Sequence, residues 1–405
     1  RAAEPDGGML PADRKRAPAK GPRRRSARNP DDGAGTEQGV RNDATGPETG
    51  RTGGGRQRPD CGINSHERAE NCELLYIFAL RIAQNVLKIM LSRRLLRIKV
   101  VKALYAHIKS ESDNMMTSEK NLLASIDKAY DLYFQMLALP AEIVRYAESR
   151  IELNRQKKLP TYEDLNPNTK FVDNAVLRVL ANSDSVNDRL AARKLGWTQQ
   201  PDLIRTLYNQ LIESDFYKEY MTRSERSFTD DRLFVENFFR FLQDNEALDT
   251  ALEELSILWN DDLGFVLAMI LRTLSNLRPS HTELKVMPQF KNDDDLAFAK
   301  TLFERSLVNY AANLEYVDRF TSNWDVERIV FMDNLILTTA MTELVSFPDI
   351  PVKVTLDEFI DISKYYSTPG SSVFINGVLD KMVESLTTEG RIAKSGRGLL
   401  DTKNA

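Results

Sequence analysis

Residues 348–380 read PDIPVKVTLDEFIDISKYYSTPGSSVFINGVLD, and they follow a second apolar pattern at residues 324–344, WDVERIVFMDNLILTTAMTEL. These two stretches decide the fold class, because their apolar residues recur at the spacing of an amphipathic helix and do not alternate as in a strand. The same helical period dominates the chain from residue 90 onward, with few strand signals. The sequence therefore predicts an all-α protein.

The helix starts in this region carry capping signals. Thr355 and Glu358 have the spacing of a capping box, in which each side chain bonds to the backbone of the other residue. The preceding segment, Pro351–Val354, is expected to be extended. Ser371 or Ser372 can cap the last helix through its hydroxyl.

A glycine inside the last helix also carries a prediction. Gly377 follows Asn376 within a helical stretch, where glycine costs helix propensity. A close contact with a neighbouring helix is the natural reason for such a glycine. We therefore expect a tight helix contact at Gly377, with Asn376 satisfying a buried backbone group.

Basic side chains gather near the start of the helical region, in residues 91–105, LSRRLLRIKVVKALY. They are Arg93, Arg94, Arg97, Lys99 and Lys102. Guanidinium groups form bidentate hydrogen bonds with phosphate and stack on unpaired bases, which suits single-stranded RNA. A solvated helix face is the alternative. The run predicts an RNA-binding helix, on which Tyr105 either stacks on a base or packs in the core.

Taken in this order, the two regions resemble the NusB family of bacterial transcription antitermination factors. The family has an Arg-rich first helix ending in A-L-Y, as at residues 103–105, and later a P-x-K-V loop and a V/I-N-G-V-L-D segment, as within residues 351–380. The resemblance implies a NusB-like helical bundle with extra central helices. It also implies RNA contact by the basic helix and by Phe374, for which core packing is the alternative.

The resemblance further implies a function. A protein of this kind binds the boxA element of nascent RNA together with NusE, a ribosomal protein of the small subunit. The pair joins an antitermination complex on RNA polymerase, so the protein is expected to be cytoplasmic and to act as a scaffold. The alternative is a helical protein-interaction module that keeps the NusB-like fold without RNA binding.

The charge of the chain is unevenly distributed. The 405 residues have a formal net charge of −4, yet residues 61–405 hold 42 Lys and Arg against 50 Asp and Glu. An acidic body is not held to nucleic acid by its overall field, so RNA contact must come from a local basic patch. The acidic remainder suits docking of a basic ribosomal protein.

Signals for catalysis, metals and membranes are weak. The sequence has no Gly-rich phosphate loop before Lys-Ser/Thr, no G-x-S-x-G and no dinucleotide fingerprint. Its three histidines and two cysteines lack metal-ligand spacing, so we expect no enzyme, no cofactor and no metal site. Residues 73–91 are apolar, but Arg81 and Lys88 argue against a membrane span.

Five segments are expected along the chain. Residues 1–89 predict a disordered extension, because residues 1–60 contain no Ile, Phe, Tyr or Trp. They are either a basic RNA-binding arm or sequence ahead of a true start at Met90. The other segments are N-terminal helices at 90–156, a helical insertion of unknown role at 157–293, the NusB-like block at 294–386 and a flexible basic tail at 387–405. Pro140 is expected to kink or break a long helix over residues 118–156.

Overall fold

The computed structural model describes residues 91–259, 261–321 and 330–403, with side chains placed as far as Leu400. Every regular element in these ranges is helical, which confirms the all-α prediction. The predictions for residues 1–89 and for a start at Met90 lie outside the described residues. Of the helices in these ranges, none is long and apolar enough to cross a membrane.

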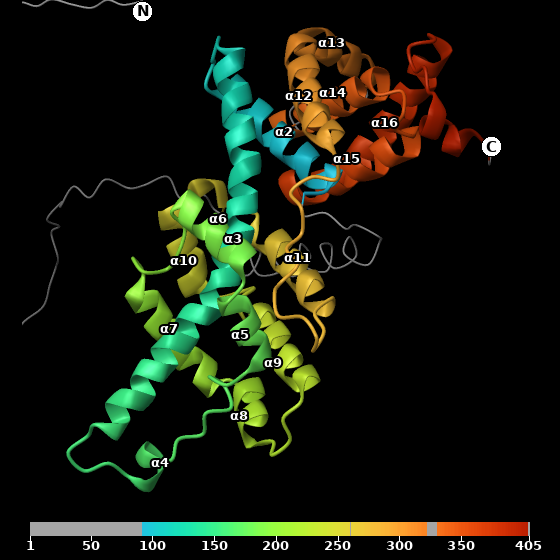
Figure 1. Cartoon of the computed structure of the whole chain (residues 1–405). Coiled ribbons are helices and arrows are strands. Elements are labelled where there is room, and N and C mark those ends of the chain that lie inside the picture. The colour runs from blue at the N-terminus through green and yellow to red at the C-terminus, as the bar shows by residue number, and fades with distance from the viewer. Residues whose placement is uncertain (1–90, 260, 322–329, 404–405) are drawn as a thin grey trace, which may run out of the picture. The chain divides into compact units, whose positions relative to one another are not determined.

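Two helices open the described chain. α2 (Arg93–Lys109) begins after Ser92, whose hydroxyl accepts a hydrogen bond from the Leu95 N–H at 3.3 Å. α3 (Met115–Arg155) continues through Pro140 as one helix and changes direction along its length (Figure 1), so of the predicted kink or break only the break is wrong. A proline removes one backbone donor, but packing against helices along its length holds α3 together.

The central insertion surrounds α3 with further helices (Figure 1). They are α4 (Tyr162–Leu165), α5 (Ala175–Ala181), α6 (Asp184–Arg193), α7 (Pro201–Glu213), α8 (Asp215–Thr222), α9 (Phe228–Phe241), α10 (Glu246–Leu255), the 3₁₀ helix η1 (Ile257–Trp259) and α11 (Leu263–Ser275). Among them, α4, α5, α6, α7, η1 and α11 contact α3 directly. The insertion is therefore built on α3 and is not a separate appendage.

The C-terminal block is a second group of helices, with α14 at its centre. Its elements are α12 (Asp293–Val308), α13 (Tyr310–Thr321), α14 (Phe331–Ser346), α15 (Val352–Tyr366), α16 (Ser371–Thr388) and the 3₁₀ helix η3 (Gly396–Lys403). α14 contacts α12, α13, α15 and α16, and α2 contacts both α12 and α14. The first described helix thus completes the block formed by the last ones.

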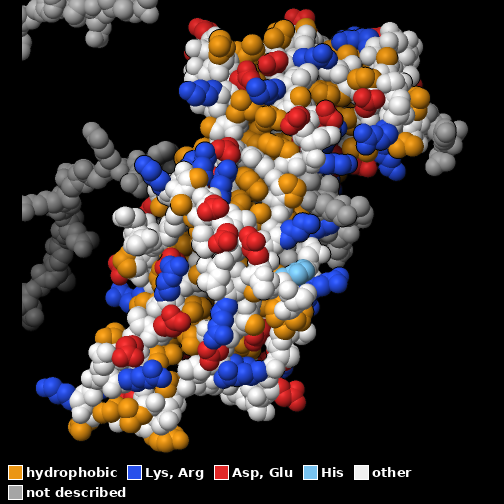
Figure 2. Space-filling model, viewed as in Figure 1, with side chains coloured by type: hydrophobic (Ala, Val, Ile, Leu, Met, Phe, Trp, Pro, Cys, Tyr) orange, Lys and Arg blue, Asp and Glu red, His pale blue; other side chains and the backbone are white. Residues whose placement is uncertain are grey.

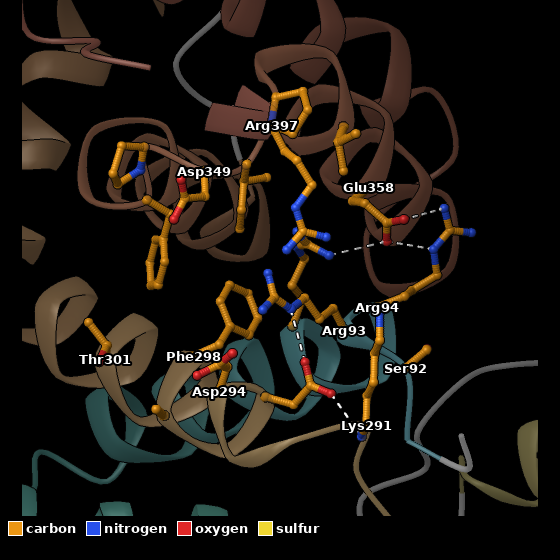
Figure 3. Close-up of a pocket in the computed structure, with 18 of the residues that line it drawn as sticks. Ser92, Arg93, Arg94, Lys291, Asp294, Phe298, Thr301, Asp349, Glu358 and Arg397 are labelled. Carbon is orange, nitrogen blue, oxygen red and sulfur yellow. Dashed lines mark hydrogen bonds and ion pairs between the residues drawn. The ribbon is translucent and has the colours of Figure 1, made fainter. Parts of the chain in front are cut away.

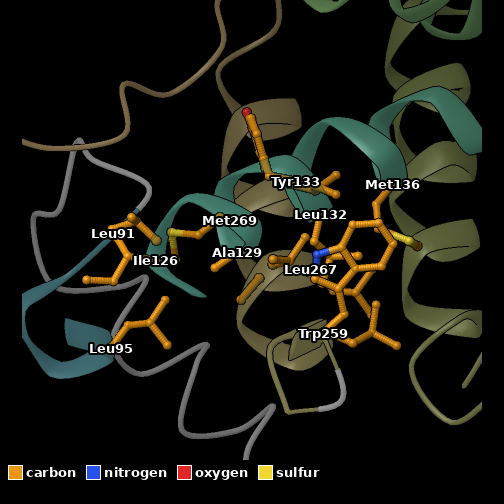
Figure 4. Close-up of a cluster of buried hydrophobic side chains, with 14 of the residues drawn as sticks. Leu91, Leu95, Ile126, Ala129, Leu132, Tyr133, Met136, Trp259, Leu267 and Met269 are labelled. Atoms are coloured by element: carbon orange, nitrogen blue, oxygen red, sulfur yellow. The ribbon is translucent and has the colours of Figure 1, made fainter. Parts of the chain in front are cut away.

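Apolar side chains from α2, α3 and the insertion meet in a shared core, shown in Figure 4. Trp259 is buried there, and its indole N–H donates to the Lys128 carbonyl oxygen of α3 at 2.8 Å. The Tyr133 hydroxyl lies 2.7 Å from the Thr273 hydroxyl of α11, and burial raises the pKa of Tyr133. Burying each such large side chain contributes about 1.5–3 kcal/mol, so this core fixes the insertion against α3.

The predicted capping residues do not cap their helices. α15 begins directly after Pro351, so Thr355 lies inside the helix and not at its start. α16 begins after Gly370, which has a positive φ of 90°. Ser371 is buried, and its hydroxyl donates to the Asp333 carboxylate at 3.0 Å. The hydroxyls of Thr355 and Ser371 instead donate to carboxylates of α14, Glu343 and Asp333. Local sequence spacing does not reveal these contacts.

The prediction of a close helix contact at Gly377 is also wrong. A Cβ added at Gly377 would meet no atom within 4 Å. Asn376 is exposed, and its amide donates to the Asp380 carboxylate at 3.4 Å and not to a buried backbone group. The face of α16 that contains Gly377 therefore has room for a side chain.

Candidate nucleic-acid interface

The apolar residues of α2 decide how its cations are arranged. The residues that bury this face are Leu95, Leu96, Val100, Val101 and Leu104. They pack against α3, α12 and α14, and two of the basic side chains, Arg97 and Lys99, are buried with them. Each of the five predicted cations forms an ion pair with a carboxylate far away in the sequence. The exposure of the pair differs widely from one residue to the next.

Arg97 is buried at the junction of α2, α14 and α15. Its guanidinium donates two hydrogen bonds to Glu343, from Nε at 2.7 Å and from Nη2 at 2.8 Å. The Thr355 hydroxyl donates to the same carboxylate at 2.8 Å. Burial by itself lowers the pKa of Arg97, but the charge and hydrogen bonds of Glu343 outweigh it and raise the pKa. In this structure Arg97 is a structural residue and cannot contact RNA, contrary to the prediction.

Lys99 is the second buried cation. Its ammonium lies 2.5 Å from the Asp262 carboxylate, which immediately precedes α11 of the insertion. Burial raises the pKa of Asp262, and the nearby charge of Lys99 opposes this shift. Lys102 pairs with the neighbouring Asp261 at a more exposed position, where the lysine side chain is 34% exposed. Lys99 is therefore also unavailable to RNA, whereas Lys102 remains accessible.

The first turn of α2 is partly open to solvent. The Arg93 side chain is 41% exposed, and its Nε donates to Asp295 at 3.1 Å. Arg94 donates to Glu358 at 2.6 and 3.0 Å and is less exposed. The Arg93 guanidinium also lies 5.1 Å from the ring centroid of Phe298, a cation–π distance. These two arginines are held in place by the protein and still border solvent.

They border a groove of about 1180 Å³, shown in Figure 3, which we call the α2–α15 groove. Its walls include Arg93, Arg94, Phe298, Pro348, Glu358 and Arg397. Lys291 and Arg397 are exposed at this groove and form no ion pair within the described part of the chain. Lys291 was not predicted, because it lies in a loop outside any basic run.

The two predicted aromatic contacts have different outcomes. Tyr105 is 40% exposed, and its ring meets Phe331 edge to face at 5.5 Å. The Lys109 ammonium lies 4.2 Å from the centroid of the same Phe331 ring, a cation–π distance. Phe374 is buried, so core packing, and not the predicted RNA contact, describes it in this structure. Tyr105 therefore remains a candidate for base stacking.

The surface as a whole carries mixed charge. Figure 2 shows basic and acidic side chains interspersed over the visible face, without one broad basic area. Within the described ranges, no group of three or more His, Cys, Asp or Glu side chains could hold a metal ion. The candidate interface therefore rests on local cations: Arg93, Lys102, Lys291 and Arg397.

The family model and the similar proteins found by comparison all indicate the same family. A family model described as the NusB family matches residues 277–384, which contain α12 to α15 and most of α16. A protein of Salinibacter ruber named "Transcription antitermination protein NusB" is 42% identical over 103 residues, covering 25% of this chain and 64% of that protein. Proteins of the same name from Chloroherpeton thalassium and Natranaerobius thermophilus are 34% and 33% identical, over 51% and 68% of their lengths. No solved structure matches the chain significantly.

The family model covers most of the C-terminal block and leaves α2 outside the matched residues. The chain spans 64% and 51% of the lengths of the first two relatives. The insertion, from α4 to α11, has no counterpart in the family match.

Proposed function

Because this chain belongs to the NusB family, we propose that it is a transcription antitermination factor that binds RNA. In this proposal it recognises a boxA-type element of nascent RNA together with the small-subunit ribosomal protein NusE, as part of an antitermination complex on RNA polymerase. It acts as a cytoplasmic scaffold and not as an enzyme.

The observation that carries the proposal is the position of α2. Although it lies outside the matched residues, α2 packs against α12 and α14 of the matched block. Its first turn opens on the α2–α15 groove, with Arg93 accessible, and farther along the helix Lys102 and Tyr105 reach solvent. Cations and an exposed aromatic ring on one helix suit the phosphates and unpaired bases of single-stranded RNA.

The acidic remainder of the molecule supports the second partner. Residues 61–405 carry an excess of Asp and Glu over Lys and Arg. Ribosomal proteins bind RNA and are typically basic, so opposite charges would speed the encounter between the two proteins. The expected result is that the pair binds RNA better than either protein alone.

A protein-interaction module without RNA binding is the second candidate, and one observation favours it. Arg97 and Lys99 form buried ion pairs within the protein, and Arg94 pairs with Glu358. This leaves the predicted basic run with few accessible charges. The two candidates differ in whether RNA binds at all.

The test is RNA binding by the full chain, with and without the ribosomal protein, over a range of salt concentrations. We would replace the accessible residues Arg93, Lys102 and Tyr105 by Ala together, and keep Arg97 and Lys99 intact because they are structural. A matched control is Arg205→Ala, since Arg205 on α7 is 60% exposed and also forms an ion pair.

The triple variant should bind RNA at least about tenfold more weakly, because stacking alone is worth about 1–3 kcal/mol per base. Loss of two phosphate contacts should flatten the salt dependence by about 0.7 for each contact. Arg205→Ala should change neither quantity. If the chain binds the ribosomal protein but no RNA at any salt concentration, the interaction module is the correct function.

A further inference from the structure

The C-terminal segment, residues 390–400, folds back on the loop between α14 and α15 instead of extending as the predicted flexible tail. The Lys394 ammonium donates to two backbone carbonyl oxygens at the end of α14, at 2.9 and 3.0 Å. The Ser395 N–H donates to the Pro348 carbonyl oxygen at 3.0 Å. These anchors fix the path of the chain immediately before Arg397.

Two glycines allow the close approach of this segment. Gly396 has a φ of +54°, which L residues with side chains rarely adopt. A Cβ added at Gly398 would lie 2.0 Å from the Pro348 carbonyl oxygen, a distance that no side chain could tolerate. Arg397 lies between these two glycines, so its backbone is held against the loop while its side chain is exposed.

The side chain of Arg397 reaches into the α2–α15 groove, toward Arg93 (Figure 3). Lys291 lines the same groove and is also exposed. Neither Arg397 nor Lys291 makes an ion pair with any side chain that the structure describes. The other cations that line the groove each pair with a carboxylate: Arg93, Arg94, Arg97 and Lys364.

The carboxylates of the groove are already engaged by other groups. Their partners are Arg94 for Glu358 and Asp361, Arg93 for Asp295, the Asn292 amide for Asp294 and the Ser395 hydroxyl for Asp349. The hydrogen-bond donors of Arg397 and Lys291 are not taken up by any of these carboxylates. A phosphate in the groove can therefore accept charge-assisted hydrogen bonds from both side chains.

We propose that Arg397 and Lys291 bind phosphodiester groups of single-stranded RNA in the α2–α15 groove, beside Arg93. This inference rests on the proposed RNA-binding function and adds the C-terminal segment to it. Val354, whose side chain is exposed, also lines the groove, where it can contact sugars and bases. Arg397 donates to phosphate through its planar fork, and Lys291 acts as a second, more mobile charge.

The test compares Arg397→Ala with the control Arg205→Ala in the full chain, using two RNAs. One is a boxA-like oligonucleotide and the other is oligo-uridine, because phosphate contacts do not depend on base sequence. Arg397→Ala should weaken binding of both RNAs by a similar factor, about fivefold at low salt. It should also reduce the salt slope by about 0.7 for the lost contact. Adding Lys291→Ala should reduce the slope again by a similar amount.

A second variant, Gly398→Ala, distinguishes the effect of the position of Arg397 from the effect of its charge. It keeps every cation but cannot fit against Pro348, so the C-terminal segment must move and RNA affinity should fall as in Arg397→Ala. Arg397→Lys should restore part of the affinity. Thermal unfolding of each variant shows whether the rest of the fold is intact.

The inference and the proposed function fail in different ways. If the chain binds RNA but Arg397→Ala leaves affinity and salt slope as in the control, the groove does not bind phosphate. If the boxA-like RNA is not preferred and the ribosomal protein has no effect, while Arg397→Ala still weakens oligo-uridine binding, the groove stands and the antitermination role falls. Absence of binding to both RNAs overturns both.

Discussion

The C-terminal block and the central insertion both hold α2, and they do so through cations only two positions apart. Arg97 joins α2 to Glu343 of the block, and Lys99 joins it to Asp262 of the insertion. The first contact is bidentate and has a third member in Thr355. The second joins one ammonium to one carboxylate whose pKa is raised by burial.

The difference between these two contacts shows how the basic residues of α2 bind both the C-terminal block and the central insertion. A planar guanidinium fixes the direction of its partner, whereas an ammonium acts as a point charge with little directional demand. The contact inside the family block is therefore geometrically specified. The contact with the insertion needs only a buried negative charge at the right distance. Variants of the two pairs can test this contrast.

Glu343→Ala should have the largest effect. It leaves both the Arg97 guanidinium and the Thr355 hydroxyl buried without their acceptor. Removing one partner of a buried ion pair costs about 3–5 kcal/mol, and the loss of the Thr355 hydrogen bond places this variant at the upper end of that range. Chemical denaturation measures the free energy of unfolding. A loss below about 2 kcal/mol would mean that the Arg97 pair is open to water.

Asp262→Ala should destabilise the protein by about 3 kcal/mol, because Lys99 then has no counter-charge. The double variant Lys99→Met, Asp262→Leu should recover most of this loss, since a hydrophobic pair of similar size can replace a buried ion pair. The corresponding replacement of Arg97 and Glu343 should recover less, because Thr355 stays unpaired. Equal recovery at both sites would contradict the contrast between the two contacts.

Gly377→Ala should stabilise the protein by about 0.5–1 kcal/mol. The helix gains propensity, and the added methyl group meets open space. Thermal unfolding should show a higher midpoint, with Asn376→Ala on the same helix as a control for exposed substitutions. A destabilised Gly377→Ala variant would restore the close helix contact that the sequence predicted.

The exposed pair Lys102–Asp261 should contribute least. It joins the same two regions as Lys99 and Asp262, but both side chains reach solvent. A double-mutant cycle with Ala at both positions should give a coupling energy of no more than about 0.5 kcal/mol, weakened further by salt. A coupling comparable to that of Lys99 and Asp262 would mean that burial is not what separates the two pairs.

The sequence predicted the fold class and the position of the basic helix, because both depend on local periodicity. It could not predict the partners of that helix. Glu343 lies 246 positions from Arg97, and Asp262 lies 163 positions from Lys99, so no spacing rule connects them. A basic run therefore predicted RNA contact at two positions that the fold uses for its own cohesion.

The capping and glycine predictions were wrong for related reasons. Thr355 has the spacing of a cap, but Pro351 starts the helix earlier and leaves the hydroxyl free to reach Glu343. Arg397 shows the reverse case, since a residue in an apparently flexible tail is placed at the groove by Gly396 and Gly398. Close backbone approaches of this kind depend on segments that meet only in the folded chain.

The unbroken course of α3 sets a distance. At 1.5 Å per residue, the part of α3 from Ile126, which packs near the start of α2, to its end at Arg155 spans about 45 Å. Beyond that end, Leu159 and Tyr162 are strongly exposed. A helix of this length keeps its two ends far apart. A molecule bound at the far end of α3 would therefore lie several nucleotide lengths away from RNA bound at α2.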